Sequence, residues 1–298
     1  MYLPKEGKGM NDTARRHTRV TTLTDLPGPL LLLGAGRMGS AMLRGWLAAG
    51  MDPHRIVIQE PVPSGMLREL IERHGLVLNP PKEVLGRIAI LVAAVKPQVM
   101  DEALAPLASL FAGRTPLVLS IAAGRTIASF KRHFGPATPV VRAMPNTPGA
   151  IGRGIAAFCA SPEVTEEQKA IARALLAALG EVVEVPEEDQ MDAVTAVSGS
   201  GPAYVFLLAE CLEAAARAQG LPDAVATRLA RATIAGAGAL LAQSPESPAD
   251  LREAVTSPGG TTAAALALLM QEGGGLCHLM RLAVEAAARR SRELAGEN

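Results

Sequence analysis

Two glycine-rich turns, far apart in the chain, each precede a predicted helix and have the composition of an anion-binding turn. The first has the spacing Gly34-x-Gly36-x-x-Gly39, and the second covers residues 257–262 with the sequence Ser-Pro-Gly-Gly-Thr-Thr. Unpaired backbone N–H groups at a helix start attract negative charge. The first spacing is typical of a turn that holds a dinucleotide pyrophosphate, and the second turn suits a small carboxylate. Together the turns predict a redox cofactor brought against a small acid.

The sequence around the first turn favours this interpretation over a purely structural turn. An apolar run at residues 30–33 comes directly before it, and apolar residues at helical spacing follow over residues 38–47. In such a strand–turn–helix unit, Gly34 permits the tight turn and Gly36 lets the backbone approach the phosphates. Gly39 then lets the helix pack closely against the strand.

Two charged residues near this turn give opposite indications about the cofactor. Glu60 follows the second predicted strand, residues 55–59, about 20 residues after the turn, where an acidic side chain binds a ribose 2′-hydroxyl and repels a 2′-phosphate. This favours NAD. Arg37, inside the turn, would instead attract an additional phosphate. The weak preference for NAD over NADP therefore stays open here, as does the alternative that Glu60 is only a solvated strand end.

Lys96 is a further candidate because of its position alone. It follows the fourth predicted strand, residues 88–95, and strand carboxyl ends line the ligand crevice of open α/β sheets. Pro97 keeps Lys96 out of helical geometry. Contact with the cofactor and an ordinary solvated loop residue are equally compatible with this pattern.

The alternation of elements predicts an α/β N-terminal Rossmann-type domain with a mostly parallel sheet, followed by an all-α C-terminal domain. Strands are predicted at residues 30–33, 55–59, 76–78, 88–95, 117–121 and 140–144. Near-continuous apolar strands separated by helices are typical of a parallel sheet covered on both faces. After about residue 186 only helical patterns remain, at residues 189–197, 202–218, 223–242, 248–255, 261–271 and 275–294. We expect a flexible tail at 1–27, a dinucleotide-binding domain at 28–187 and a helical domain at 188–298.

Composition excludes several other classes of function. The chain has 298 residues, of which 49% are apolar, and its formal net charge is zero, which gives no support for nucleic-acid binding. Three widely spaced cysteines, Cys159, Cys211 and Cys277, form no metal or disulfide framework, so we expect no metal and a reducing, cytoplasmic setting. No apolar run approaches the roughly 20 residues of a membrane span. The N-terminal segment lacks the apolar core of a secretory signal, and Met10 is an alternative start.

Five motifs in order give the chain a family resemblance. These are Gly34-Ala35-Gly36-Arg37-Met38-Gly39, Ala94-Val95-Lys96-Pro97-Gln98, Met144-Pro145-Asn146-Thr147-Pro148, Ala196-Val197-Ser198-Gly199-Ser200-Gly201-Pro202-Ala203-Tyr204 and Val255-Thr256-Ser257-Pro258-Gly259-Gly260-Thr261-Thr262. From about residue 30 to the C-terminus the chain resembles pyrroline-5-carboxylate reductase. The resemblance implies hydride transfer from NAD(P)H to the C=N carbon of 1-pyrroline-5-carboxylate, giving L-proline. It also implies a homodimer through the helical domains and a larger ring of dimers.

The residue patterns and the resemblance together give the expected roles of individual residues, and the roles of Thr262 and of residues 144–146 rest on the resemblance. The cofactor contacts are Gly34, Ala35, Gly36, Arg37, Met38, Gly39, Glu60, Ala94, Val95, Lys96, Pro97, Met144, Pro145 and Asn146, and the substrate contacts are Thr195, Ser257, Gly259, Gly260, Thr261 and Thr262. Thr262, beside the ring nitrogen, is the catalytic candidate. The family usually has Asn in place of Arg37 and often a small hydroxyl residue near Glu60. Both departures concern the choice between NADH and NADPH.

Two other functions compete with this interpretation. A 3-hydroxyacid dehydrogenase of similar two-domain plan would need a helix Lys or a similar acid/base group in its second domain, and residues 189–298 contain no Lys. A non-catalytic module that senses dinucleotides would not require the turn at residues 257–262. No His or carboxylate lies in either turn, so we expect the imine to arrive already protonated or to gain its proton through water.

Overall fold

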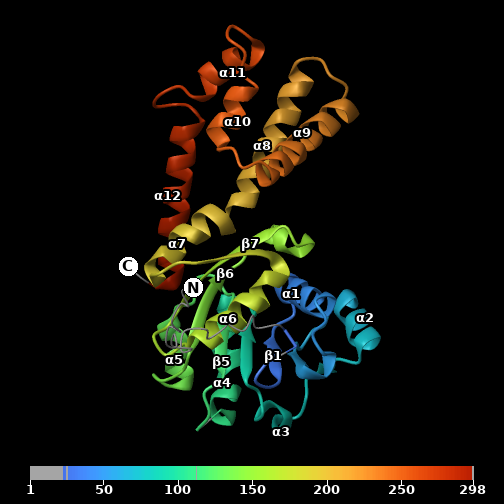
Figure 1. The fold of residues 1–298 in the computed structure, drawn as a ribbon, viewed down its shortest axis with the longest axis vertical. Coiled ribbons are helices and arrows are strands. Elements are labelled where there is room, and N and C mark those ends of the chain that lie inside the picture. The colour runs from blue at the N-terminus through green and yellow to red at the C-terminus, as the bar shows by residue number, and fades with distance from the viewer. Residues whose placement is uncertain (1–22, 25, 112, 297–298) are drawn as a thin grey trace, which may run out of the picture.

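The computed structural model describes residues 23–24, 26–111 and 113–296, which form two parts of different architecture. In Figure 1 the sheet and its covering helices lie at one end, and helices α8 to α12 extend away from them as an arm. The predicted fold class is confirmed: a mostly parallel sheet comes first and a purely helical region follows.

The sheet has eight strands in the order β3-β2-β1-β4-β5-β6-β7-β8. Their bounds are Leu30–Leu33 (β1), Ile56–Gln59 (β2), Val77–Leu78 (β3), Ile90–Ala93 (β4), Leu117–Ser120 (β5), Val140–Met144 (β6), Gly154–Ala160 (β7) and Gly180–Glu184 (β8). All neighbouring strands pair in parallel except β6 and β7, which are antiparallel. The order reverses at β1, between β2 and β4, which is where such sheets bind ligands.

Helices cover both faces of this sheet because alternate side chains of each strand point to opposite faces. Leu30 and Leu32 of β1 pack with one core cluster, while Leu31 and Leu33 pack with the other. The first cluster includes residues of α1 (Arg37–Ala48), α2 (Gly65–His74) and α6 (Glu166–Leu176). The second includes residues of α3 (Lys82–Leu85), α4 (Met100–Leu110) and α5 (Ile127–Phe134). Short 3-10 helices η1 (Pro53–Arg55), η2 (Pro97–Val99), η3 (Thr147–Ile151), η4 (Ala177–Leu179) and η5 (Glu188–Gln190) connect these elements.

Two strands, β7 and β8, were not among the predicted ones. β7 has the sequence Gly-Ile-Ala-Ala-Phe-Cys-Ala, whose small residues carry little strand propensity. β8, Gly-Glu-Val-Val-Glu, lies at the edge of the sheet and is half exposed. Glu184 in β8 forms ion pairs with Lys169 and Arg173 of α6. Pairing across the sheet, rather than local sequence, makes both segments strands.

The end of the predicted flexible tail, residues 1–27, is packed rather than flexible. Leu23 and Leu26 are buried in the first core cluster. The Arg55 guanidinium donates hydrogen bonds to the carbonyl oxygens of Thr24 and Leu26, which ties this segment to the start of β2. Residues 1–22 lie outside the described part of the chain.

The helical part consists of α7 (Met191–Val194), a π-helical turn (Thr195–Gly199), α8 (Gly201–Ala218), α9 (Asp223–Gln243), α10 (Pro248–Ala254), α11 (Thr261–Leu269) and α12 (Leu276–Ala295). Helices α8 and α9 pack against each other, and α12 returns to α7 and the π turn. Neither α8 nor α11 contains a buried residue. Among the helices that the structure describes, none has the length and hydropathy to cross a membrane.

We expect the Trp46→Phe variant to lower the free energy of unfolding by about 2 kcal/mol, because it leaves a buried carbonyl without a donor. Trp46 in α1 is fully buried, and its Nε1 donates to the carbonyl oxygen of Leu175 in the last turn of α6 at 2.8 Å. Urea unfolding followed by circular dichroism measures the change, since the chain has one Trp and the variant has no Trp signal. The exposed Val62→Ala variant is the control. Equal midpoints for both variants would contradict this role of Trp46.

Candidate functional site

The first glycine turn joins β1 to α1 with the geometry of a phosphate cradle. Gly34 has a φ of +89°, and a Cβ there would lie 2.6 Å from Val95 Cγ1. Gly39 lies against the carbonyl of Gly34, so a side chain at Gly39 would push the helix off the strand. At Gly36, the N-cap of α1, a Cβ would meet no atom within 4 Å. The turn is therefore closed on its protein side and open where a ligand would approach.

Glu60 fixes this turn directly, which its sequence position did not reveal. Its Oε2 accepts a hydrogen bond from the Ala35 backbone N–H at 2.9 Å, and its Oε1 accepts one from the Val62 N–H at 3.1 Å. Asn79 holds the Glu60 backbone through two hydrogen bonds, of 2.9 and 3.0 Å. Asn79 has a φ of +48°, a left-handed conformation that Asn tolerates. The sequence signal that could have identified Asn79 is its position as a polar residue directly after the third strand.

A cleft of about 520 Å³ opens beside this turn at the carboxyl ends of the strands. Its lining includes Gln59, Asn79, Val95 and Glu102. The volume lies in the range of small-molecule sites. Lys96 is exposed, N-caps η2, and makes no side-chain hydrogen bond or ion pair within the described residues. The structure thus gathers residues 34–39, Glu60 and residues 94–97 at one edge of the sheet.

Asn146 and Met144, at the end of β6, connect the sheet to the helical part. Asn146 Oδ1 accepts a hydrogen bond from the Ile155 N–H at 3.0 Å, and its Nδ2 donates to Ser198 Oγ at 3.4 Å. Met144 packs against Gly199, where an added Cβ would lie 2.5 Å from the methionine Cε. The side-chain carbonyl of Asn146 therefore shapes the start of β7, and its NH2 group is the part that faces the helical domain.

Thr195 and Ser198 lie in the π-helical turn, where the sequence predicted a continuous helix over 189–197. The Ser200 N–H donates to the Thr195 carbonyl at 2.9 Å. This hydrogen bond spans five residues, whereas an α-helical hydrogen bond spans four. The Thr195 hydroxyl donates to the Met191 carbonyl at 2.8 Å, and the Tyr204 hydroxyl donates to the Ala196 carbonyl at 3.0 Å. π turns inside helices occur frequently at functional sites. This turn presents Ser198 to Asn146.

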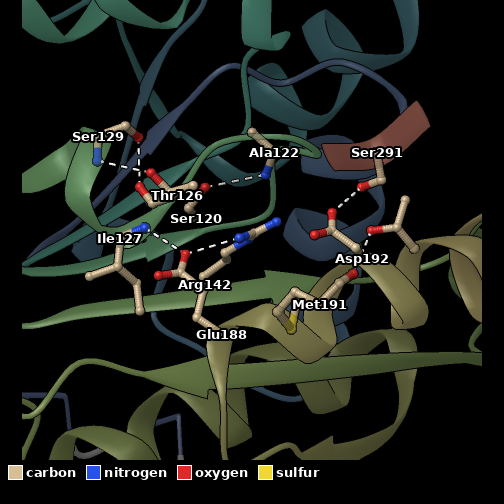
Figure 2. A network of polar contacts seen from close by, with 11 residues as sticks. Ser120, Ala122, Thr126, Ile127, Ser129, Arg142, Glu188, Met191, Asp192 and Ser291 are labelled. Carbon is tan, nitrogen blue, oxygen red and sulfur yellow. Dashed lines mark hydrogen bonds and ion pairs between the residues drawn. The ribbon is translucent and has the colours of Figure 1, made fainter. Parts of the chain in front are cut away.

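A buried polar network fixes the junction between the two parts (Figure 2). The Arg142 guanidinium, on β6, pairs with Glu188 Oε1 of η5 at 2.9 Å, and the same oxygen accepts the Ile127 N–H at the start of α5 at 2.8 Å. Asp192 of α7 accepts a hydrogen bond from Ser291 of α12. Arg142, Asp192 and Ser291 are all buried. These contacts tie β6, which ends at Met144, to η5, and they tie α7 to α12 beside the π turn.

Cys159 lies opposite Arg142 in the antiparallel pairing of β6 and β7. Burial, and secondarily the charge of Glu188, raise the pKa of the Cys159 thiol to about 12. The thiol therefore stays protonated at neutral pH and is a packing residue, not a nucleophile.

The second glycine turn lies in the arm, between α10 and α11, and not beside the first. Figure 1 shows α10 and α11 in the outer part of the arm, away from β1 and α1. Gly259 has a φ of +70°, and Gly260 is the N-cap of α11 with no side-chain partner for the first N–H groups. Thr262 is half-buried, and its hydroxyl makes no hydrogen bond within the described chain. Ser257, Gly259 and Thr261 are exposed.

The helices of the arm leave a large apolar surface open. A cleft of about 350 Å³ between α8 and α12 is lined by Tyr204, Val205, Leu207, Leu208, Cys211, Leu276, Leu279, Met280 and Ala283. Phe206 is 61% exposed and Leu268 is 73% exposed. Contiguous exposed apolar surface of this kind marks an interaction site.

Comparison with known proteins gives a consistent result for both parts. A family model described as pyrroline-5-carboxylate reductase dimerisation matches residues 188–294, and one described as NADP oxidoreductase, coenzyme F420-dependent, matches residues 30–124. A pyrroline-5-carboxylate reductase of Synechocystis is 41% identical over 266 residues, which cover 88% of this chain and 97% of that protein. The corresponding protein of Mycobacterium tuberculosis is 38% identical, with 89% and 96% covered.

Solved structures agree with the sequence comparison. A pyrroline-5-carboxylate reductase from Coxiella burnetii superposes with a TM-score of 0.82 at 34% identity, covering 90% of this chain and 98% of that one. A Plasmodium falciparum pyrroline carboxylate reductase with NADP bound superposes with a TM-score of 0.76 at 28% identity, with the same coverage.

We expect the Glu188→Ala variant to lower the free energy of unfolding by about 3 kcal/mol, because it leaves the buried Arg142 guanidinium without its carboxylate. The Ile127 N–H loses its acceptor in the same variant. Asp189→Ala is the matched control, since Asp189 is exposed and its side chain makes no hydrogen bond or ion pair within the described chain. Urea unfolding of both variants measures the difference. If Glu188→Ala unfolds at the same midpoint as Asp189→Ala, the network does not stabilise the junction.

Proposed function

The chain belongs to the pyrroline-5-carboxylate reductase family, and we propose that residues 28–187 bind the dinucleotide while residues 188–298 bind the substrate and a second protomer. Its reaction is the reduction of 1-pyrroline-5-carboxylate to L-proline with NAD(P)H, the last step of proline biosynthesis. The observation that carries this conclusion is the match to the Synechocystis reductase at 41% identity, which extends over both parts of the chain.

The sheet-based part fits a dinucleotide on geometric grounds. The turn at residues 34–39 is open at Gly36, the N-terminus of α1 faces that opening, and the adjoining cleft has room for a ligand. Backbone N–H groups of the turn would hold the pyrophosphate, and Met144, Pro145 and Asn146 would border the nicotinamide. When bound, the reduced nicotinamide supplies the hydride.

The turn before α11 suits the substrate's carboxylate. Gly259 and Gly260 carry no side chains, so the N–H groups at the start of α11 converge with Ser257 and Thr261 around a small anion. The Thr262 hydroxyl accepts a hydrogen bond from the protonated ring nitrogen and so orients the C=N carbon. Thr195 lines the same pocket from the π turn. No ionisable side chain occurs between Val255 and Ala263, so the iminium proton comes with the substrate or through water.

The second turn lies in the arm, away from the first turn of the same protomer, so we infer that a working site combines the first turn of one protomer with the second turn of its partner. The exposed apolar surface of the arm supplies the surface for such a homodimer. The match to a dimerisation model over residues 188–294 supports the same assignment. Assembly of dimers into a ring is a further expectation. We place the enzyme in the cytoplasm, where thiols stay reduced.

We also propose that NADH is preferred over NADPH. The Glu60 carboxylate, held by the Ala35 and Val62 N–H groups, lies where a ribose 2′-hydroxyl binds in this fold and would repel a 2′-phosphate. Arg37 is exposed at the first position of α1 and acts in the opposite sense. Glu60 is the better anchored of the two, because Arg37 makes no side-chain hydrogen bond within the described residues.

We expect the Thr262→Ala variant to lose turnover about a hundredfold while binding NADH as tightly as the wild type, because only a group that contacts the reacting ring is removed. Thr262→Ser, which keeps the hydroxyl, should recover most of the activity. A sensor without catalysis would be indifferent to both changes. Steady-state kinetics and cofactor titration measure the effect.

Mixing the Thr262→Ala variant with a Gly36→Asp variant tests whether the site is shared between protomers. The Gly36 site has space for a side chain, so the second variant should fold but repel the pyrophosphate. Reassociated equal mixtures should regain about a quarter of wild-type activity, since half of the dimers are mixed and each has one intact site. No recovery in verified mixed dimers would show that both turns act within one protomer.

For the cofactor, the Glu60→Gln variant should lower the ratio of kcat/KM for NADH to that for NADPH by about tenfold, because it removes the charge that repels the 2′-phosphate. Glu69→Gln, on the exposed face of α2, is the charge-matched control. Oxidation of each cofactor with 1-pyrroline-5-carboxylate gives both ratios. A wild-type enzyme that favours NADPH would overturn the proposed preference.

A further inference from the structure

A second cavity opens at the amino ends of the strands, at the edge of the sheet opposite the cofactor cleft. It has a volume of about 460 Å³. Segments that lead into β1, β4 and β5 surround it, together with one side of α6. Its lining consists of Pro27, Gly28, Pro29, Arg87, Ile88, Ala89, Arg114, Thr115, Pro116, Leu117, Gln168 and Ile171. We call it the rear cavity.

The polar side chains of the rear cavity are suited to donate hydrogen bonds. Within the described part of the chain, the Arg87 and Arg114 guanidinium groups make no hydrogen bond and no ion pair. Gln168 uses its Oε1 to accept the Thr165 N–H at 3.0 Å, which leaves its NH2 group as a donor. Thr115 adds a hydroxyl. No carboxylate is among the described residues that line the cavity.

Apolar residues and glycine make up the rest of the lining. Ile88, Leu117 and Ile171 are buried beneath its floor, whereas Pro27, Pro29 and Ala89 are at least partly exposed. A bare inorganic ion would leave this surface in contact with water, whereas an organic body would cover it. The cavity also exceeds the volume that a small inorganic anion needs, and it falls in the range of sites for organic ligands.

We propose that the rear cavity binds a small phosphate monoester, with the phosphate between Arg87 and Arg114 and an apolar ring against Pro27 and Ala89. Two guanidinium groups on separate segments match the charge and the several acceptor oxygens of a phosphate. The site is separate from the dinucleotide cradle, because it lies at the other ends of β1 and β4. The proposal for the rear cavity does not depend on which cofactor or substrate the enzyme uses.

Titration calorimetry with phenyl phosphate tests the proposal in the full-length protein, with NADH saturating the dinucleotide cleft. We expect one binding site per chain. The Arg87→Ala and Arg114→Ala variants should each weaken binding by about tenfold, the loss of one charge-assisted pair. Both should keep wild-type reductase activity and melting temperature. Arg73→Ala, an exposed arginine on α2 outside the cavity, is the matched control and should bind like the wild type.

Three results would overturn the proposal. One is the absence of binding at millimolar phenyl phosphate, and another is unchanged affinity in both cavity variants. Equal affinity for inorganic phosphate would show that the apolar lining does not contribute, which contradicts an organic ligand. A variant with a lowered melting temperature is replaced by Arg87→Gln or Arg114→Gln, which keeps a neutral side chain of similar reach.

Discussion

Unburied apolar surface in the helical part is the constraint on which the rest of this structure depends. Helices α8 and α11 bury no residue in a single protomer, although α8 carries valine, phenylalanine and leucine side chains and α11 carries leucines. Exposed area of this kind is costly in water, at about 25 cal/mol for each Å² of apolar surface. A second protomer removes that cost. In the shared site that we propose, the same association would bring the turn at residues 257–262 of one chain to the turn at residues 34–39 of the other, and folding and catalysis would then depend on one interface.

The junction between the two parts fixes the orientation of the arm relative to the sheet. Arg142, Glu188 and Asp192 are polar groups in a region otherwise packed with apolar side chains, and each has a defined partner. Hydrogen bonds between buried charged groups have strict geometry, so they fix the direction in which the arm leaves the sheet. Asn146, which is hydrogen-bonded to both Ile155 and Ser198, links the end of β6 to the π turn in the same way.

Local sequence patterns were sufficient for the elements whose signals are strong. The apolar strands from β1 to β6 and the long helices after residue 200 appear where periodicity and glycine or proline boundaries indicate. β7 and β8 did not carry such signals, because alanine-rich and edge strands depend on pairing with neighbours. The bond between Glu60 and the Ala35 N–H, and the Asn79 contacts that support it, were also beyond prediction, since they join segments separated in sequence. The carboxylate role of the turn at residues 257–262 rests on its glycines and its position before a helix, and the role of Thr262 rests on the family resemblance. Both stay predictions, because one chain does not bring that turn to the turn at residues 34–39.

The two ends of the sheet restrict where this protein can associate. β3 has two residues, and β8 carries Glu181 and Glu184 at the opposite border, with Glu184 paired to Lys169 and Arg173. Short or charged borders discourage another chain from adding a strand there. Edge-to-edge polymerisation is thereby suppressed, and self-recognition is left to helical surfaces alone. Substitutions in the arm helices can therefore change the number of subunits while the edges of the sheet stay unchanged. Such substitutions do not promote the edge-to-edge stacking of sheets that is seen in amyloid.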